Sequence, residues 1–279
     1  MSMSLRHKII LGILLGSFGL LTVLLYETAV PRALRLIFFD IGQGDALFIE
    51  TESGRQVLID TGADGRRVLQ KLADAIPFYD NTIDLLVLTH PDLDHIGGTL
   101  QVLESYRIGG VLLPYVTKDT SLLLGIVHAL QEQNIPVLFA QRGERINLDE
   151  ETVLDILWPP QRAEQVFSSG NDVSIVARLR YKNDSFLLTG DIEERGERAL
   201  VALGSHLSSD VLKVGHHGSK TSTSAEFLQA VRPNLAIISV GENSYGHPNP
   251  EVLERLSGMQ ILRTDENGDI TLVSKGDSF

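Results

Sequence analysis

Short apolar runs alternate with amphipathic stretches along most of the chain. The runs are rich in β-branched residues and end in Gly, His or Asp, a pattern typical of buried strands. They are Leu34–Phe39, Gln56–Ile59, Ile83–Thr89, Ser185–Leu188, Asp210–Val214 and Leu235–Val240. Apolar residues at helical spacing predict helices over Val68–Ile76, Leu122–Gln133, Glu193–Leu203 and Ser224–Val231. Hairpins are expected at Thr51–Arg55 and Lys182–Asp184.

This order of elements predicts an α/β layer protein. Polar side chains collect after the strands, as they do when a site lies along one edge of a sheet. Residues 34–150 and 151–279 each contain several strands, a ligand-bearing loop and flanking helices, so we expect a duplicated, four-layer αββα sandwich. Because no linker follows Leu34, we divide the chain into an N-terminal segment, 1–31, and one main domain, 32–279.

The N-terminal segment contains a charge-free apolar run from Ile9 to Tyr26, preceded by Arg6 and Lys8. As a helix, this run is long enough to cross the roughly 30 Å core of a bilayer. We therefore expect an uncleaved single-pass anchor with the main domain outside the cytoplasm. The alternatives are a cleaved signal peptide, which would give a secreted protein, and a buried helix of the globular domain.

Composition narrows the possible functions. With 43% hydrophobic and 22% charged residues among 279, the chain can form a sizeable core. Cysteine is absent, which excludes disulfides, thiolate zinc sites and cysteine nucleophiles. The net charge of −12 argues against a strongly basic nucleic-acid-binding surface, but not against a nucleic-acid substrate held through metal ions.

A cluster of metal-binding residue types follows the apolar run at 83–89. His90, Asp92, Asp94 and His95 fall within six residues. Asp94 and His95 can reach one ion from a tight turn, and His90 and Asp92 a second. The alternative is a polar surface loop, but four such residues at a strand end predict water activated on divalent metal.

Other strand ends carry further candidate residues. Asp191 could simply cap the following helix, but together with the cluster at 90–95 it is expected to bridge two metal ions. His216 and His217 lie between glycines, and the alternative is a structural histidine pair. His247, beside Pro248, has the weakest independent case.

Three strand-end carboxylates, Asp40, Asp45 and Asp60, are expected to orient ligands, because metal-bound histidine usually donates its second N–H to an acceptor. The remaining histidines, His7, His128 and His206, are interpreted as structural.

Taken together, these motifs resemble the metallo-β-lactamase superfamily, and more narrowly the C-terminal hydrolase domain of ComEC-type competence proteins. The motifs are Asp40–Asp45, Leu58–Gly62, His90–Gly98, Leu188–Asp191, Gly215–Ser219, Gly246–Pro248 and Arg263–Ile270. The resemblance implies an αββα sandwich with two metal ions. It implies His90 and Asp92 on the first ion, Asp94 and His95 on the second, and Asp191 bridging them. His216 would complete the coordination of the second ion, with His217 as an alternative ligand or a proton donor.

The chain departs from the common superfamily pattern at two ligand positions. Asp92 stands where histidine is usual, and the histidine that normally precedes the bridging aspartate is missing, so that Asn171 or Asp172 could substitute. Oxygen ligands favour Mn²⁺ or Mg²⁺ relative to Zn²⁺. We therefore expect two divalent ions, Mn²⁺ or Zn²⁺. The family's DNA-conducting role is not transferred, because ComEC-type proteins also carry a large multi-span region.

The predicted activity is metal-dependent phosphodiester hydrolysis, with DNA outside the cytoplasm as the substrate and the competence or DNA-uptake machinery as a possible partner. Asp94 would orient the attacking water, and His217 or His247 would protonate the leaving oxygen. Donors from the His216–Lys220 loop would offset charge on phosphoryl oxygens. The alternatives are a carbonyl hydrolase of the lactonase or β-lactamase type, and a non-catalytic, membrane-tethered metal-binding module.

Overall fold

The computed structural model describes residues 4–29, 33–115, 120–160 and 170–277; for residues 20 and 22–29 it describes the backbone but not the side chains. The chain forms two compact units, Met1–Arg32 and Ala33–Phe279. The first unit contains a single helix, α1 (Leu5–Ala29). The second contains all the strands and the other described helices.

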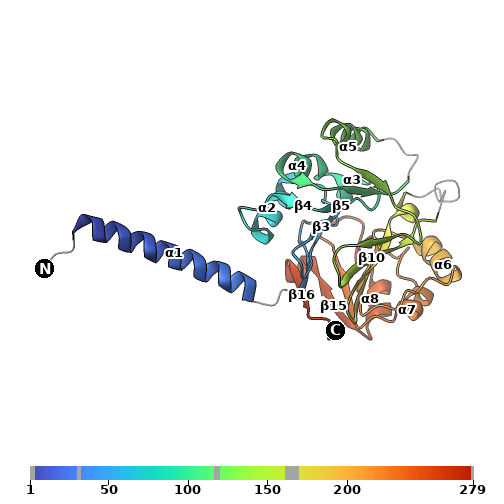
Figure 1. Ribbon diagram of the computed structural model, residues 1–279. Coiled ribbons are helices and arrows are strands. Elements are labelled where there is room, and N and C mark those ends of the chain that lie inside the picture. Colours follow the sequence, from blue (N-terminus) through green and yellow to red (C-terminus); the bar gives the residue numbers. More distant parts are fainter. Residues whose placement is uncertain (1–3, 30–32, 116–119, 161–169, 278–279) are drawn as a thin grey trace. The chain divides into compact units, whose positions relative to one another are not determined.

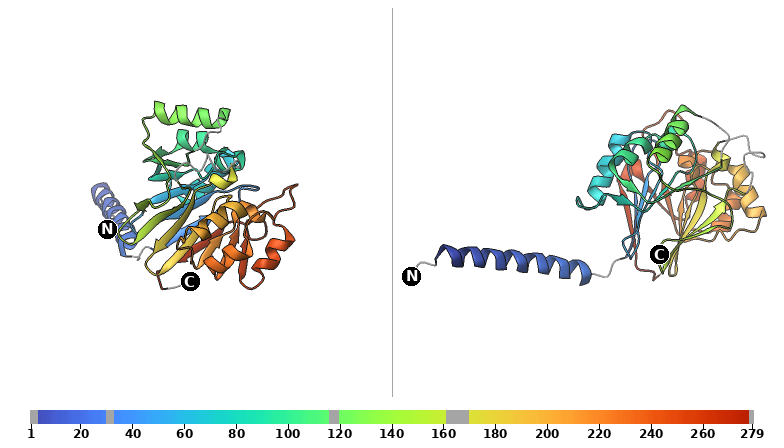
Figure 2. Two further views of the ribbon diagram at one scale, coloured as in Figure 1. Left: turned by 90° about the vertical axis from the view of Figure 1, so that its right-hand side faces the viewer. Right: turned by 45° about the horizontal axis from the view of Figure 1, so that its top comes forward.

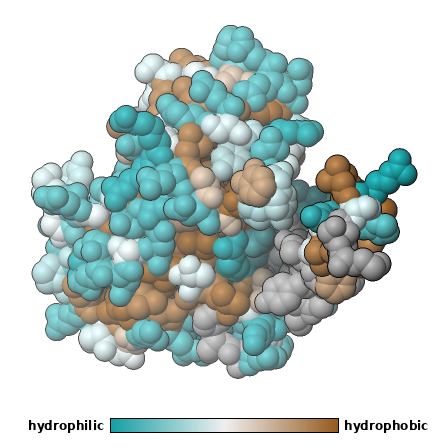
Figure 3. All heavy atoms as spheres, turned by 90° about the vertical axis from the view of Figure 1, so that its left-hand side faces the viewer, coloured by the Kyte–Doolittle hydropathy of each residue, from teal (hydrophilic) through white to brown (hydrophobic). Residues whose placement is uncertain are grey.

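Large apolar side chains of α1, among them Ile13, Leu14 and Phe18, are exposed. In Figure 3, brown hydrophobic side chains lie at the surface among teal hydrophilic ones. Among the described residues, no helix combines the length and the apolar character needed to cross a membrane. The membrane-spanning helix expected at Ile9–Tyr26 is therefore not confirmed, and part of that range has side chains outside the description.

Two seven-stranded sheets form the main unit. The first has the strand order β16-β1-β2-β3-β5-β7-β8, and the second has the order β15-β14-β13-β12-β11-β10-β9. The first sheet contains β1 (Leu34–Phe38), β2 (Leu47–Glu50), β3 (Gln56–Ile59), β5 (Leu85–Val87), β7 (Val111–Leu113), β8 (Val137–Phe139) and β16 (Ile270–Ser274). The second contains β9 (Arg145–Asn147), β10 (Thr152–Trp158), β11 (Val176–Tyr181), β12 (Asp184–Leu188), β13 (Val211–Lys213), β14 (Leu235–Ile238) and β15 (Gln260–Arg263). A small pair, β4 (Thr82–Ile83) and β6 (Arg107–Ile108), lies beside them.

Helices cover the outer face of each sheet, and Figures 1 and 2 show the two helical groups on opposite sides of the sheets. The first group is α2 (Gly65–Ala75), α3 (Leu93–Ile96), α4 (Thr99–Ser105) and α5 (Ser121–Glu132). The second is α6 (Glu194–Ala202), α7 (Ala225–Val231) and α8 (Pro250–Leu256), and a short α9 (Thr264–Asn267) follows β15. The expected four-layer αββα sandwich is therefore confirmed.

Three hydrophobic cores hold these layers together. The central core lies between the sheets and joins residues such as Leu36 and Ile49 to Leu179 and Phe186. Two outer cores fasten the helices to the sheets. Burial of apolar surface on both faces explains why the strands read as nearly continuous apolar runs in the sequence.

Polar residues fix where the helices begin. Asp64 accepts a hydrogen bond from the Arg66 N–H at the start of α2, and Ser224 does the same for Phe227 at the start of α7. Thr120 caps α5 in the same way. These caps satisfy N–H groups that have no partner inside the helix.

The structure differs from the sequence prediction in two respects. The run predicted as one strand, Ile83–Thr89, is divided into β4 and β5 at Asp84, whose carboxylate accepts the Gln56 N–H. The two sequence halves also exchange strands: β9 lies before residue 151 but joins the second sheet, and β16 returns to pair with β1. Pairing along sheet edges depends on hydrogen bonds between distant segments, which local patterns do not encode.

Candidate metal centre

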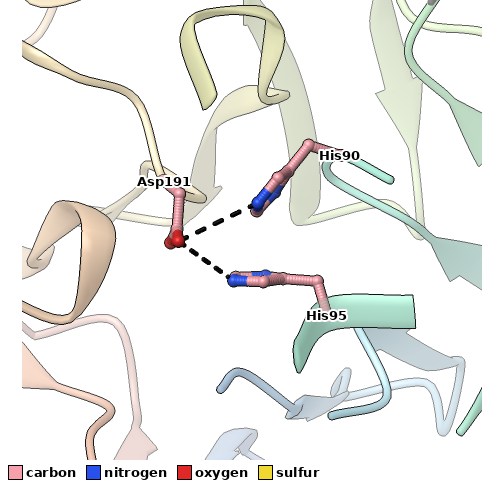
Figure 4. Close-up of side chains that lie close together, drawn as sticks. All are labelled: His90, His95 and Asp191. Carbon is pink, nitrogen blue, oxygen red and sulfur yellow. Dashed lines mark ion pairs between the residues drawn. The ribbon is translucent and has the colours of Figure 1, made fainter. Parts of the chain in front are cut away.

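Loops from both sheets bring the candidate residues to one end of the sandwich. His90 follows β5 and Asp60 follows β3 in the first sheet, whereas Asp191 follows β12 and His217 follows β13 in the second. All four side chains are at least 97% buried. Figure 4 shows His90, from the loop after β5, and His95, from α3, pointing toward Asp191 in the loop after β12.

Asp191 lies at the centre of this group. Its Oδ2 is 3.9 Å from His90 Nε2, 3.1 Å from His95 Nε2 and 3.3 Å from His217 Nε2. The rings of His90 and His95 approach to 4.0 Å between centroids. A single carboxylate facing three imidazoles from both sheets is placed as a bridging ligand would be.

Hydrogen bonds fix the orientation of all three imidazoles. His95 Nδ1–H donates to Asp60 Oδ2 at 2.8 Å, and His217 Nδ1–H donates to the Ser239 carbonyl at 2.9 Å. Thr89 Oγ1 donates its only proton to Asp60. Thr89 Oγ1 can therefore only accept from the His90 Nδ1–H, which lies 3.1 Å away. Because each Nδ1 is committed as a donor, each Nε2 is the atom available to bind a metal ion.

Left-handed backbone explains why His217, and not His216, enters this group. Both histidines have positive φ, 48° for His216 and 52° for His217. This conformation is costly for residues with a Cβ and is typical of functional sites. It turns the two side chains apart: His216 Nδ1 faces Glu193 Oε1 at 3.3 Å, and His216 lies within 3.4 Å of the Asn171 amide.

The aspartates of the 90–95 segment lie at the surface of the group. Asp94 Oδ2 is 3.3 Å from His217 Nε2, and Asp92 Oδ2 is 3.7 Å from His90 Nε2. Both aspartate side chains are 36% exposed, so they border solvent where the histidines do not. This arrangement pairs Asp92 with His90, and Asp94 with His95 and His217.

The charges of these groups are strongly coupled. Burial alone would lower the pKa of His217, but the carboxylates of Asp191, Asp94 and Asp45 together outweigh burial and raise that pKa to about 10. For His95 too, nearby carboxylates overcome burial and hold its pKa well above the ordinary value. Burial and the charge of His95 keep the pKa of His90 well below the ordinary value, so His90 is neutral. Carboxylates that raise histidine pKa values in this way attract positive charge, whether protons or metal ions.

The donor set fits divalent metal ions. Nε2 of His90, His95 and His217, and Oδ1 of Asp191, are buried and lack a well-formed hydrogen bond to any described residue. Leaving buried polar atoms unpaired is costly, and a cation at this position would satisfy them. Ligand atoms within 4.8 Å of one another are found in the sets His90–His95–Asp191 and Asp94–His95–His217. These residues could therefore hold two ions that share Asp191.

A buried lysine not anticipated from the sequence lies beneath this group. Lys213 Nζ is 2.5 Å from Asp45 Oδ2, and both side chains are at most 5% exposed. Asp45 Oδ1 is also 3.5 Å from His217 Nδ1. Burial would lower the pKa of Lys213, but the carboxylates of Asp45, Asp191 and Asp60 together outweigh burial and raise the pKa. The sequence signal was a single charged residue inside an apolar strand, which burial makes costly unless it is paired.

A groove of about 560 Å³ gives access to the group from outside. Asp92, Asp94, Asp191 and His217 line it, together with His216 and His247. The His247 ring lies 5.5 Å from that of His216 and stacks 5.8 Å from Tyr245. Burial and the charge of His216 lower the pKa of His247. His247 therefore faces the groove without belonging to any metal-binding set of the described residues.

Some predicted residues lie elsewhere. Asp40 accepts hydrogen bonds from the Gly42 N–H and Arg67, outside the metal-binding sets found among the described residues. Asp172 accepts the N–H groups of Glu193 and Gly196 and so supports the start of α6. Asn171 contacts the His216 ring at 3.4 Å, at the edge of the group.

The histidines expected to be structural also lie outside the described metal-binding sets. His7 Nδ1 is hydrogen-bonded to Ser4 Oγ, and His128 lies 3.5 Å from Glu132 on α5.

Similar proteins come from bacterial competence systems. ComE operon protein 3 of Bacillus subtilis (strain 168) is 35% identical over 262 residues, which cover 83% of this chain and 32% of that protein. Competence protein ComA of Neisseria gonorrhoeae is 32% identical over 82% of this chain and 31% of its own length. The chain thus spans about a third of the length of these curated relatives.

Solved structures show the same fold at low sequence identity. CmlA, a diiron beta-hydroxylase from Streptomyces venezuelae, matches with a TM-score of 0.56 and 16% identity over 88% of this chain and 55% of that chain. The metallo-beta-lactamase fold protein YhfI from Bacillus subtilis gives a TM-score of 0.55 and 9% identity over 85% of this chain and 99% of that chain. Residues 39–242 match the family model described as the metallo-beta-lactamase superfamily. The paired sheets and the His–Asp centre at their ends agree with this match. The chain therefore belongs to the metallo-β-lactamase superfamily and resembles the ComEC-type competence proteins within it.

Proposed function

We propose that this protein is a metal-dependent phosphodiesterase that cleaves nucleic acid. The observation that carries the proposal is the convergence of three Nε2 atoms, from His90, His95 and His217, on Asp191 at the base of an open groove. The similarity to competence proteins favours DNA as the substrate and DNA uptake as the setting.

We assign the ligands from the side-chain geometry. His90 and Asp92 would hold one ion, Asp94, His95 and His217 the other, and Asp191 both. When bound, divalent ions act as Lewis acids and lower the pKa of a water molecule toward neutrality. Asp92 supplies an oxygen donor where histidine is common, and this supports Mn²⁺ over Zn²⁺.

The remaining groups of the groove would act on the water and the substrate. Asp94 is partly exposed, and its carboxylate is placed to accept a hydrogen bond from the attacking water. His217 is only 1% exposed and faces Asp191, so we assign it to metal binding and not to proton transfer. His216, held by Glu193, and His247 line the groove, so we assign contacts with the phosphate and the leaving oxygen to them.

We also propose that the domain works outside the cytoplasm, in line with a substrate that arrives as external DNA. The support is the charge-free sequence from Ile9 to Tyr26 after Arg6 and Lys8. Protease treatment of intact cells should degrade the main domain and spare a cytoplasmic marker. Full protection of the domain would contradict this location.

The activity is tested with two substrates, bis(p-nitrophenyl) phosphate and plasmid DNA, in Mn²⁺, Mg²⁺ or Zn²⁺. We expect turnover of both, strongest with Mn²⁺, and its loss with EDTA or in Asp94→Ala. His128→Ala is the matched control, because His128 is an exposed residue of α5 paired with Glu132. Turnover of a lactone or nitrocefin with Zn²⁺, without phosphodiester cleavage, would overturn the assignment in favour of a carbonyl hydrolase.

A further inference from the structure

A second groove, of about 680 Å³, lies on the strands β9, β10 and β11 of the second sheet, where its wall is rich in arginine. Arg142, Arg145, Arg178 and Arg180 line it, along with Ser205 and His206 from the segment after α6. It shares no lining residue with the groove that reaches the metal centre. It is therefore a separate surface feature.

The charge of this groove is opposite in sign to that of the whole chain. Four arginines line it against two carboxylates, Glu144 and Asp155, in a protein whose net charge is −12. A local positive surface on an acidic protein focuses anions at that position. This groove is therefore a candidate anion-binding site.

The arginines are held in place without being fully neutralised. Asp155 accepts from both Arg145 Nε and Arg180 Nε at 2.7 Å, so one carboxylate fixes two guanidinium groups. Arg178 Nε donates to Ser209 Oγ at 3.2 Å, and no described carboxylate lies within ion-pair distance of it. Arg142 donates to the Leu203 carbonyl. Guanidinium groups positioned in this way can still offer N–H pairs to a phosphate.

A hydroxyl group in the same groove also lacks a partner. Ser205 Oγ is buried and makes no hydrogen bond to any residue in the described part of the chain. Unpaired buried hydroxyls are uncommon, because their desolvation is not compensated. Because Ser205 itself is half-buried at the groove wall, rotation of its side chain would let this hydroxyl donate a hydrogen bond to a bound phosphate oxygen.

The backbone connects this groove to the rim of the metal centre. The Arg142 N–H donates to the Pro159 carbonyl, and the preceding Trp158 donates its indole N–H to the Asp172 carbonyl at 2.7 Å. The neighbouring Asn171 contacts His216 at the edge of the metal-centre groove. One end of β10 therefore lies between the two sites.

We infer that the arginine groove binds the sugar-phosphate backbone of the nucleic acid whose phosphodiester is cleaved at the metal centre. The inference rests on the proposed function and names the part of the protein that holds the rest of the strand. Contacts of this kind recognise phosphate and carry no base specificity. A small phosphodiester fills the metal-centre groove alone, whereas a long strand engages both.

The test compares Arg142→Gln/Arg178→Gln with the wild-type full chain on bis(p-nitrophenyl) phosphate and on long single-stranded DNA. We expect unchanged turnover of the small substrate, and a KM for DNA raised roughly tenfold, because phosphate contacts set affinity. Binding of labelled single-stranded DNA is measured in EDTA at several salt concentrations. In a plot of log binding constant against log salt concentration, the slope of the double variant should be smaller in magnitude by about 1.4, or about 0.7 for each lost phosphate contact. Arg178→Lys should recover part of the binding.

Arg55→Gln is the matched control, because Arg55 is exposed in the β2–β3 hairpin, away from the strand ends that carry Asp45 and Asp60. It should change neither activity nor DNA binding. An unchanged salt dependence in the double variant would overturn the groove assignment, and so would wild-type protein that fails to bind DNA in EDTA. Loss of DNA binding in the double variant, with wild-type protein inactive on both substrates, would retain the groove and reject the proposed phosphodiesterase.

Discussion

Lys213 and Asp45 form a buried ion pair, with 2.5 Å between Nζ and Oδ2, directly beneath the candidate metal centre. Lys213 Nζ also donates to the Gly190 carbonyl, next to Asp191 in the chain. The lysine thus supplies positive charge to a region that contains Asp45, Asp60 and Asp191. It also links β13 to the loop that carries Asp191.

Lys213→Met should destabilise the fold. The substitution leaves Asp45 buried without its cation, and breaking a buried pair costs about 3–5 kcal/mol. Urea denaturation of the purified protein measures the change. Arg55→Met, which breaks the exposed pair with Asp84, should cost no more than about 1 kcal/mol. Equal losses of unfolding free energy in the two variants would show that the buried Lys213–Asp45 pair stabilises the fold no more than an exposed pair does.

His217 and His216 should differ in their effect on metal content. His217→Ala should weaken metal binding by more than about 100-fold, since residues that only orient ligands already contribute 10–100-fold. His216→Ala should keep two ions per chain and lose activity only, because its ring faces Glu193 and Asn171. Elemental analysis and native mass spectrometry give the stoichiometry. A normal metal content in His217→Ala would contradict the ligand assignment.

Metal affinity should rise with pH. In the metal-free protein, carboxylates raise the pKa of His95, and they raise that of His217 to about 10. Below those values each ring holds a proton that a metal ion must displace, so binding releases protons and gains about tenfold in affinity per proton for each pH unit. Calorimetry in two buffers of different ionisation enthalpy counts the protons. His217→Ala should release one fewer, and pH-independent binding would contradict the prediction.

Gly44→Ala should disturb the approach of the Asp45 loop to α3. A Cβ at Gly44 would lie 2.2 Å from the Asp94 carbonyl oxygen, and its φ of 125° disfavours other residues. The Asp45 N–H that donates to the same carbonyl at 3.1 Å would be displaced. We expect a loss of about 2 kcal/mol or more in the free energy of unfolding, together with weaker metal binding.

Gly268→Ala is the comparison for this variant. Gly268 also has positive φ, 68°, but apart from its chain neighbours no atom of the described residues lies within 4 Å of its added Cβ. It should therefore show the backbone strain alone, about 1 kcal/mol, with metal binding intact. Thermal unfolding and metal titration of both variants separate the two effects. Equal losses of stability and unchanged metal binding in both variants would contradict the proposed clash between a Cβ at Gly44 and the Asp94 carbonyl.

Local sequence patterns predicted the elements that flank the site. The strand at Gln56–Ile59 has the predicted bounds. The helix predicted at 122–133 differs from α5 by one residue at each end, and the helix predicted at 224–231 differs from α7 by one residue at its start. These elements combine apolar periodicity with a polar cap, so neighbouring residues carry the information. By contrast, β8 and β9 are short edge strands, whose pairing partners are distant in sequence.

The sequence by itself determined the chemistry: His90, Asp92, Asp94 and His95 follow one strand end, and Asp191 follows another. Only the tertiary structure shows that His217 lies beside Asp191 and His216 beside Glu193, since two successive left-handed residues send adjacent side chains in different directions. Only the packing of the two sheets brought Lys213 to Asp45 and left Asp40 outside. The reason is physical: residue type sets which ligands are possible, but distance and burial, which depend on long-range packing, set which of them meet.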